Sequence, residues 1–188
     1  MGNKIKIFDV DDTLVVTKSK IKVYDGKTKK WFELTPQEFN HYQTKPHHTK
    51  VDFSDFRDLE ILKAGKTIDW VFEILRRAVR KGTPVGVITA RDDKGIVCDF
   101  LAHNGVNINC NYIYAINDPQ LGFTGSTAEK KKQAFQRFVD LGFTNFEFYD
   151  DDAENIRLAN QLAKEDPTVK MKAKLIKQKW IPRFDDFS

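Results

Sequence analysis

The sequence predicts an α/β protein with a doubly wound, mainly parallel sheet and a small insertion near the start of the chain. Short apolar segments alternate with longer segments whose apolar residues recur at helical spacing, which is typical of parallel sheets. The 188 residues are enough for one domain of roughly 150 residues and an insertion. The regular pattern stops early and resumes at Thr67. We therefore expect a core of residues 1–17 and 67–188, with an inserted unit of residues 18–66.

The inserted unit is predicted to contain a hairpin and a short helix. Ile21–Lys27 alternates apolar and polar residues up to a turn at Asp25-Gly26, and Lys30–Leu34 supplies the return strand. Thr35-Pro-Gln-Glu38 places proline at the first helical position and forms a capping box, so a short helix should begin here. Residues 43–66 show no clean period, and we expect them to be irregular.

The core is predicted to alternate strands with helices. The expected strands are Lys4–Val10, Pro84–Thr89, Tyr112–Ile116, Phe146–Tyr149 and Val169–Leu175. The last of these alternates lysine with apolar residues, which is typical of a half-exposed edge strand. The expected helices lie between Thr67 and Gly82, between Asp93 and Gly105, between Ser126 and Gly142, and over Ala153–Lys164.

Positive charge is concentrated in the insertion. Residues 18–50 hold eight lysines against three acidic residues, a local net charge of +5, whereas the whole chain carries +4. Aromatic residues lie among these lysines, and local basicity favours an anionic partner. We predict that Lys27, Lys29 and Lys30 bind substrate. A hairpin whose lysines are merely solvated is the alternative.

Polar side chains stand at the ends of three predicted strands. They are Asp9, Asp11, Thr89, Asp150 and Asp151. Because the carboxyl ends of parallel strands meet at one edge of a sheet, these side chains should converge there. Oxygen donors of this kind suit Mg²⁺. A lysine among Lys130–Lys132 and a hydroxyl beside the metal suit a transferring phosphoryl group.

These segments resemble the four motifs of the haloacid-dehalogenase-like (HAD-like) phosphatase superfamily, in the form of a small phage-type or acid-phosphatase/nucleotidase-like member. The matching segments are Asp9-Val-Asp-Asp-Thr13, Val85-Gly-Val-Ile-Thr89, a lysine among Lys130–Lys132, and Phe146-Glu-Phe-Tyr-Asp150-Asp151. The resemblance covers roughly residues 4–165. It departs at Asp12, where the superfamily most often has glycine, so the way the backbone turns at that point is open.

The resemblance implies a role for each matching residue. Asp9 would attack phosphorus to give an aspartyl-phosphate, and Asp11 would act as general acid and then as general base. Mg²⁺ would be held by Asp9, by the backbone carbonyl of Asp11 and by Asp150, with Asp151 close behind. Thr89 would contact the phosphoryl oxygens.

The catalytic lysine is expected to be Lys131. Ala134, Phe135 and Phe138 lie three, four and seven residues after it, so the face next to its own is buried and Lys131 points inward. Thr13 and Arg91 are expected at the edge of the site, Arg91 in a substrate-binding or positioning role.

The sequence therefore favours a Mg²⁺-dependent phosphatase acting on a nucleotide or a nucleic-acid phosphate end, with residues 18–66 as a small cap that leaves the site open. The alternatives are a phosphatase of phosphoproteins or small metabolites, and a nucleic-acid-binding module on an inactive scaffold. No apolar run approaches the ~20 residues of a membrane helix and no signal peptide is recognised, so we expect a cytoplasmic protein without an obligate protein partner. Cys98 and Cys110 are expected to be reduced and mostly buried.

Overall fold

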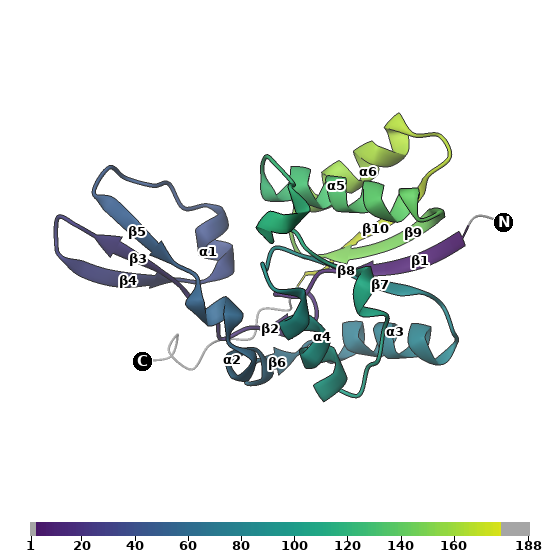
Figure 1. The fold of residues 1–188 in the computed structure, drawn as a ribbon, viewed down its shortest axis with the longest axis horizontal. Helices are drawn as coiled ribbons and strands as arrows, with labels where there is room; N and C mark the ends of the chain where they lie inside the picture. Colours follow the sequence, from purple (N-terminus) through teal and green to yellow (C-terminus); the bar gives the residue numbers. More distant parts are fainter. Residues whose placement is uncertain (1–2, 178–188) are drawn as a thin grey trace.

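The computed structural model describes residues 3–177, and a five-stranded parallel sheet forms their centre (Figure 1). Its strands are β1 (Asn3–Phe8), β7 (Val85–Thr89), β8 (Ile113–Ala115), β9 (Phe143–Asp150) and β10 (Lys170–Leu175). They lie in the order β10-β9-β1-β7-β8, and every neighbouring pair is parallel. The expected edge strand is β10, with its three lysines exposed.

Helices cover both faces of this sheet, which confirms the doubly wound α/β class. The helices are α3 (Asp69–Arg80), α4 (Lys94–His103), α5 (Thr127–Asp140) and α6 (Ala153–Glu165). One core cluster packs α3 and α4 against the sheet through residues such as Phe72 and Phe100. The other packs α5 and α6 against the opposite face through Phe135, Phe138 and Leu162. Figure 1 shows α5 and α6 above the sheet and α3 and α4 below it.

The strand order changes direction beside β1. The chain passes from β1 to β7 and β8 on one side, and then returns to β9 and β10 on the other. In open α/β sheets, ligands bind in the crevice beyond the carboxyl ends of the strands at such a switch point. The ends of β1 and β9 therefore mark the place where a site is expected.

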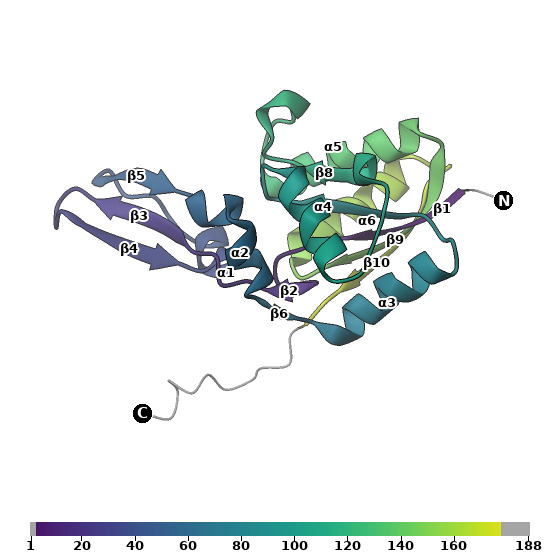
Figure 2. The ribbon, with the colours of Figure 1, turned by 60° about the horizontal axis from the view of Figure 1, so that its bottom comes forward.

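The insertion contains a second, antiparallel sheet of order β4-β3-β5. It is built from β3 (Ile21–Asp25), β4 (Lys30–Leu34) and β5 (His48–Asp52). The predicted capping box begins α1 (Pro36–Asn40). A two-stranded ribbon of β2 (Val15–Val16) and β6 (Lys66–Thr67) stands where the insertion leaves and rejoins the core. Figures 1 and 2 both show this small sheet beside the core, with the turn between β3 and β4 at its remote end.

Residues 43–66 are not irregular, so that expectation was wrong. They contain β5, the 3₁₀ helix η1 (Ser54–Arg57) and α2 (Leu59–Lys63), whose first turn is capped by the side chain of Asp58. The sequence of β5, His-Thr-Lys-Val-Asp, shows no apolar alternation, and the strand is held by pairing with β3. An element of five residues is also too short to reveal a helical period.

The two cysteines are not free thiols, which corrects a second expectation. Cys98 of α4 and Cys110, at the start of the 3₁₀ helix η2 (Cys110–Tyr112), form a disulfide with their Cα atoms 5.9 Å apart. Both pack against the α3/α4 core cluster. A single pair 12 residues apart carries no framework pattern, so its pairing could not be read from the sequence. Separately, none of the helices in residues 3–177 has the length and apolar character needed to cross a membrane.

Candidate active site

The site begins at the end of β1, where Asp9 follows a run of buried apolar residues. Its backbone N–H donates to the carbonyl of Tyr149 over 2.9 Å, so the pairing of β1 with β9 continues to Asp9. The rings of Phe8 and Tyr149 stack beneath it with their centroids 4.8 Å apart. Asp9 is only 5% exposed. The sheet therefore fixes a buried carboxylate at the switch point.

The chain then turns sharply at Asp12, which has a φ of 62°. This is the left-handed region that glycine adopts easily and that aspartate tolerates better than most residues. The Asp12 N–H donates to the carbonyl of Val15, which closes the turn. The backbone therefore turns at Asp12 as it would at a glycine, which answers the question left open by the sequence. The same turn brings the Thr13 hydroxyl to Asp9, where it donates to Oδ2 over 3.0 Å.

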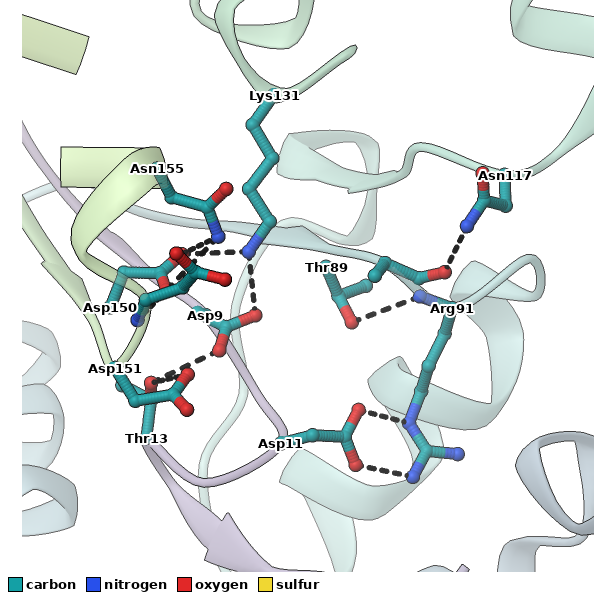
Figure 3. A network of polar contacts seen from close by, with 12 residues as sticks. Asp9, Asp11, Thr13, Thr89, Arg91, Asn117, Lys131, Asp150, Asp151 and Asn155 are labelled. Carbon is teal, nitrogen blue, oxygen red and sulfur yellow. Dashed lines mark hydrogen bonds and ion pairs between the residues drawn. The ribbon is translucent and has the colours of Figure 1, made fainter. Parts of the chain in front are cut away.

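Lys131 is the lysine that enters the site. Its Nζ donates to Asp9 Oδ1 over 2.8 Å and to Asp150 Oδ2 over 2.7 Å, and the side chain is 3% exposed (Figure 3). Its neighbours point elsewhere: Lys130 contacts Asn117, and Lys132 contacts Glu165 on α6. The helical phase read from the sequence therefore placed the correct one of the three lysines inside.

Asp150 ends β9 and is completely buried. Its Oδ1 accepts from the backbone N–H of Asp152, and the Asn155 side-chain amide lies within 3.2 Å of both its oxygens. Asn155 comes from the first turn of α6 and was not among the site residues predicted from the sequence. Asp152 caps the same helix by accepting from the N–H of Glu154.

Arg91 connects the site to the insertion. Its Nη2 and Nε donate to the two carboxylate oxygens of Asp11 over 2.7 and 3.0 Å, and Arg91 is 2% exposed (Figure 3). Its Nη1 donates to the carbonyl of Phe56 in η1, and the guanidinium lies 4.9 Å from the centre of the Phe56 ring. The backbone N–H of Arg91 contacts the buried hydroxyl of Thr89 at the end of β7. Arg91 and Asp11 thus form a bidentate ion pair, which was not predicted from the sequence.

The carboxylates carry more negative charge than the protein neutralises. Oxygens of Asp9, Asp150 and Asp151 all lie within 4.8 Å of one another, and Lys131 is the cation that contacts two of them. When all three groups are ionised, three carboxylates and one ammonium leave two formal negative charges, a state that becomes complete only at high pH or with a bound cation. Burial raises the pKa of Asp9 to about 7, an effect that Lys131 opposes and Asp150 reinforces. Burial and the charges of Asp9 and Asp150 raise the pKa of Asp151 to about 9.

This donor set fits a hard divalent cation. Carboxylate oxygens are the preferred ligands of Mg²⁺, which usually keeps several waters and binds through one or two carboxylates. A charge of +2 would balance the excess on Asp9, Asp150 and Asp151. The Asp11 carboxylate lies outside this group because it is turned toward Arg91, so a contact from Asp11 to the metal through its backbone carbonyl stays a prediction.

The hairpin lysines do not approach the carboxylates. Lys27, Lys29 and Lys30 are exposed at the turn between β3 and β4, at the remote end of the small sheet in Figures 1 and 2. The five residues of β3 alone span roughly 17 Å at about 3.4 Å per residue. A group bound at Asp9 would not reach these lysines, so a role for them requires a long substrate.

A small cavity at the carboxylates adjoins two larger ones, one of which lies on the side of Gln37 and Asp151. A cavity of about 70 Å³ is lined by Asp9, Asp11, Lys131 and Asp151 among others, and it can hold a few water-sized groups at about 10–15 Å³ each. A larger cavity of about 510 Å³ lies between the insertion and the core. Pro36, Ala90 and Thr127 line both, so the cavities are neighbours.

Comparison with known proteins yields little. No protein-family model matches the chain, and no curated protein matches it. A solved structure of a putative 3-deoxy-D-manno-octulosonate 8-phosphate phosphatase from Vibrio cholerae is similar to it, with 15% identity and a TM-score of 0.37 over 89% of this chain. The aligned part spans 63% of that structure's chain.

Proposed function

We propose that this protein is a Mg²⁺-dependent phosphatase of the HAD-like superfamily, which hydrolyses phosphomonoesters through an aspartyl-phosphate on Asp9. One observation carries the proposal: Lys131 reaches across the ends of β1 and β9 to contact both Asp9 and Asp150 in a buried cluster. An ammonium at this position can stabilise the charge of a transferring phosphoryl group, and in a site shielded from water its effect is large.

In the first step, an oxygen of Asp9 attacks phosphorus and the bond to the leaving oxygen breaks. Asp11 gives a proton to that oxygen, which requires that it first exchange one of its two bonds with Arg91 for a proton while Arg91 keeps the other. Asp11 lines the small cavity, whereas its partner Arg91 lines the larger one. The acid therefore stands where the two cavities adjoin, which is the place that the leaving oxygen would occupy.

In the second step, water attacks the phosphorus of the aspartyl-phosphate and the bond to Asp9 breaks. Asp11, now a carboxylate, takes the proton of that water. Thr13 holds Asp9 through Oδ2 in both steps, and Lys131 offers its ammonium to the phosphoryl oxygens. Mg²⁺, when bound by Asp9, Asp150 and Asp151, would supply positive charge beside the phosphoryl oxygens.

The proposed substrate is a nucleotide or the phosphate end of a nucleic acid. The basic insertion, with its local net charge of +5, favours an anion that extends past the transferred phosphate. The inactive-scaffold alternative is disfavoured by the buried cluster itself. Burying carboxylates destabilises a protein by several kcal/mol per ion unless they are compensated. A protein that only binds nucleic acid does not need buried carboxylates.

The test is turnover of a panel of phosphomonoesters by the wild type and by Asp9→Asn, each with Mg²⁺ and with a chelator. Asp99→Asn is the matched control, because Asp99 is an exposed aspartate on α4 away from the site. The proposal expects Mg²⁺-dependent turnover that Asp9→Asn abolishes and Asp99→Asn leaves intact. Turnover by Asp9→Asn at the wild-type rate would exclude Asp9 as the nucleophile.

A further inference from the structure

The larger cavity is built from two walls of different character. The insertion contributes the rings of Phe39, Phe53 and Phe56, and the core contributes polar residues that include Asp92 and Asn117. The rings of Phe39 and Phe53 meet edge to face with their centroids 5.3 Å apart. Phe53 keeps 43% of its surface exposed. The volume of about 510 Å³ falls within the range of about 300–1,000 Å³ that is typical of small-molecule sites.

A contact between Arg57 and Asp92 joins the two walls beside the carboxylates. Arg57 of η1 reaches the core and donates to Asp92 Oδ2 through Nη2 over 2.6 Å and through Nε over 2.9 Å. Arg91 lines the core wall of this cavity and is also ion-paired with Asp11. Because the cavity shares Pro36, Ala90 and Thr127 with the small cavity at Asp9, it lies where the leaving group of a bound phosphomonoester would extend.

The character of the walls selects among leaving groups. Aromatic rings on one side favour a flat, apolar-faced group, and base–aromatic stacking does not depend on which base is present. The polar groups of the core wall, on Asp92 and Asn117, suit ring heteroatoms and sugar hydroxyls. A phenyl ring offers these groups no hydrogen-bonding atom, and an aliphatic polyol would gain little from the phenylalanines. A nucleoside satisfies both walls.

We propose that this cavity is the subsite for the terminal nucleoside of the substrate, with its base stacked on the phenylalanines of the insertion and its polar edge toward Asp92 and Asn117. The assignment rests on the proposed phosphatase function and refines it. It places nucleoside recognition at the contact between the insertion and the core, away from the hairpin lysines. The side chain to change is Phe53, because it is half exposed and because the ring that contacts Arg91 is that of Phe56.

The first experiment compares kcat/KM for adenosine 5′- and 3′-monophosphate, phosphotyrosine and glycerol phosphate in the wild type and in Phe53→Ala. Phe53→Ala is expected to lower kcat/KM for the better adenosine monophosphate about tenfold, or about 1.4 kcal/mol, which lies within the range for stacking on one aromatic residue. The value for glycerol phosphate should change less than twofold. The matched control is Trp70→Ala, which removes an exposed aromatic side chain on α3, outside the cavity, and should change neither value.

The second experiment measures binding without turnover. Calorimetry with adenosine monophosphate and the Asp9→Asn variant, with and without Phe53→Ala, should show the same roughly tenfold weakening, equal to about 1.4 kcal/mol. If no phosphomonoester is hydrolysed but this weakening is found, the nucleoside subsite stands and the proposed function fails. If the enzyme is active but Phe53→Ala affects glycerol phosphate equally, or affects nothing, the subsite is overturned. Preference for phosphotyrosine over both nucleotides would also overturn it.

Discussion

Replacing Lys131 with methionine is expected to destabilise the protein strongly and in a pH-dependent way. The ammonium contacts Asp9 and Asp150, whose side chains are 7% and 0% exposed, so its removal leaves two buried carboxylates without their cation. Breaking a buried ion pair by removing one partner costs about 3–5 kcal/mol, a large share of the roughly 5–15 kcal/mol that stabilises an ordinary domain. Methionine keeps much of the side-chain volume, so the packing of α5 should survive.

The pH dependence follows from the proton on Asp9. Burial raises the pKa of Asp9 from 3.8 to about 7, so the folded protein holds this proton to a higher pH than the unfolded chain does. The free energy of unfolding of the metal-free protein therefore falls as the pH rises between these two values, by on the order of 4 kcal/mol in total from this group. Without Lys131 the pKa of Asp9 rises further, because an attractive charge is lost. The loss in free energy of unfolding caused by Lys131→Met should then be smaller near about pH 5 and larger near about pH 8.

Urea denaturation of the metal-free protein at those two pH values measures the effect. The control is Lys132→Met on the same helix, whose partly exposed contact with Glu165 should cost less than about 1 kcal/mol. Adding Mg²⁺ should raise the stability of the wild type most at high pH, because the ion replaces protons on the carboxylates. Equal losses for the two variants, or a loss for Lys131→Met that does not grow with pH, would refute the description of the buried charge cluster.

Three further outcomes are expected. Chelation should stop turnover and Mg²⁺ restore it, and Asp150→Ala should require far more metal; full activity in excess chelator would remove the metal from the mechanism. Arg91→Lys should lower kcat about tenfold to a hundredfold, because one charge-assisted hydrogen bond to Asp11, the proposed general acid, is worth about 1.5–3 kcal/mol; an unchanged kcat would deny Arg91 a positioning role. Charge reversal at Lys27, Lys29 and Lys30 should weaken use of a phosphorylated oligonucleotide in a salt-sensitive way while sparing a mononucleotide; equal effects on both, or none, would mean that the hairpin does not bind nucleic acid.

Local sequence signals predicted those parts of the fold whose cause is itself local. The capping boxes at Thr35 and Ser126 begin α1 and α5. The alternation of apolar strands with amphipathic helices predicted the doubly wound core. The phase of α5 alone placed Lys131 inside, because a buried helix face is visible in three or four neighbouring residues.

The features that the sequence did not reveal depend on contacts between distant segments. Strand β5 has a polar sequence and exists because β3 offers it a pairing edge. The ion pair of Arg91 and Asp11 joins residues 80 positions apart. The disulfide joins two cysteines that belong to no recognisable sequence motif. The large cavity likewise combines rings such as Phe53 with core residues such as Asn117. No periodicity or spacing rule connects such pairs.

The central claim is that Asp9 carries the phosphoryl group, and acid quenching of a single turnover followed by peptide mass spectrometry tests it most directly. The Asp11→Asn variant with an aryl phosphate is suited to this, because the aryl leaving group needs little help from an acid while hydrolysis of the intermediate lacks its base. The account predicts one phosphoryl group on the peptide that contains Asp9, formed only when Mg²⁺ is present. A phosphoryl group on another residue, or product release without any phosphorylated enzyme, would contradict it.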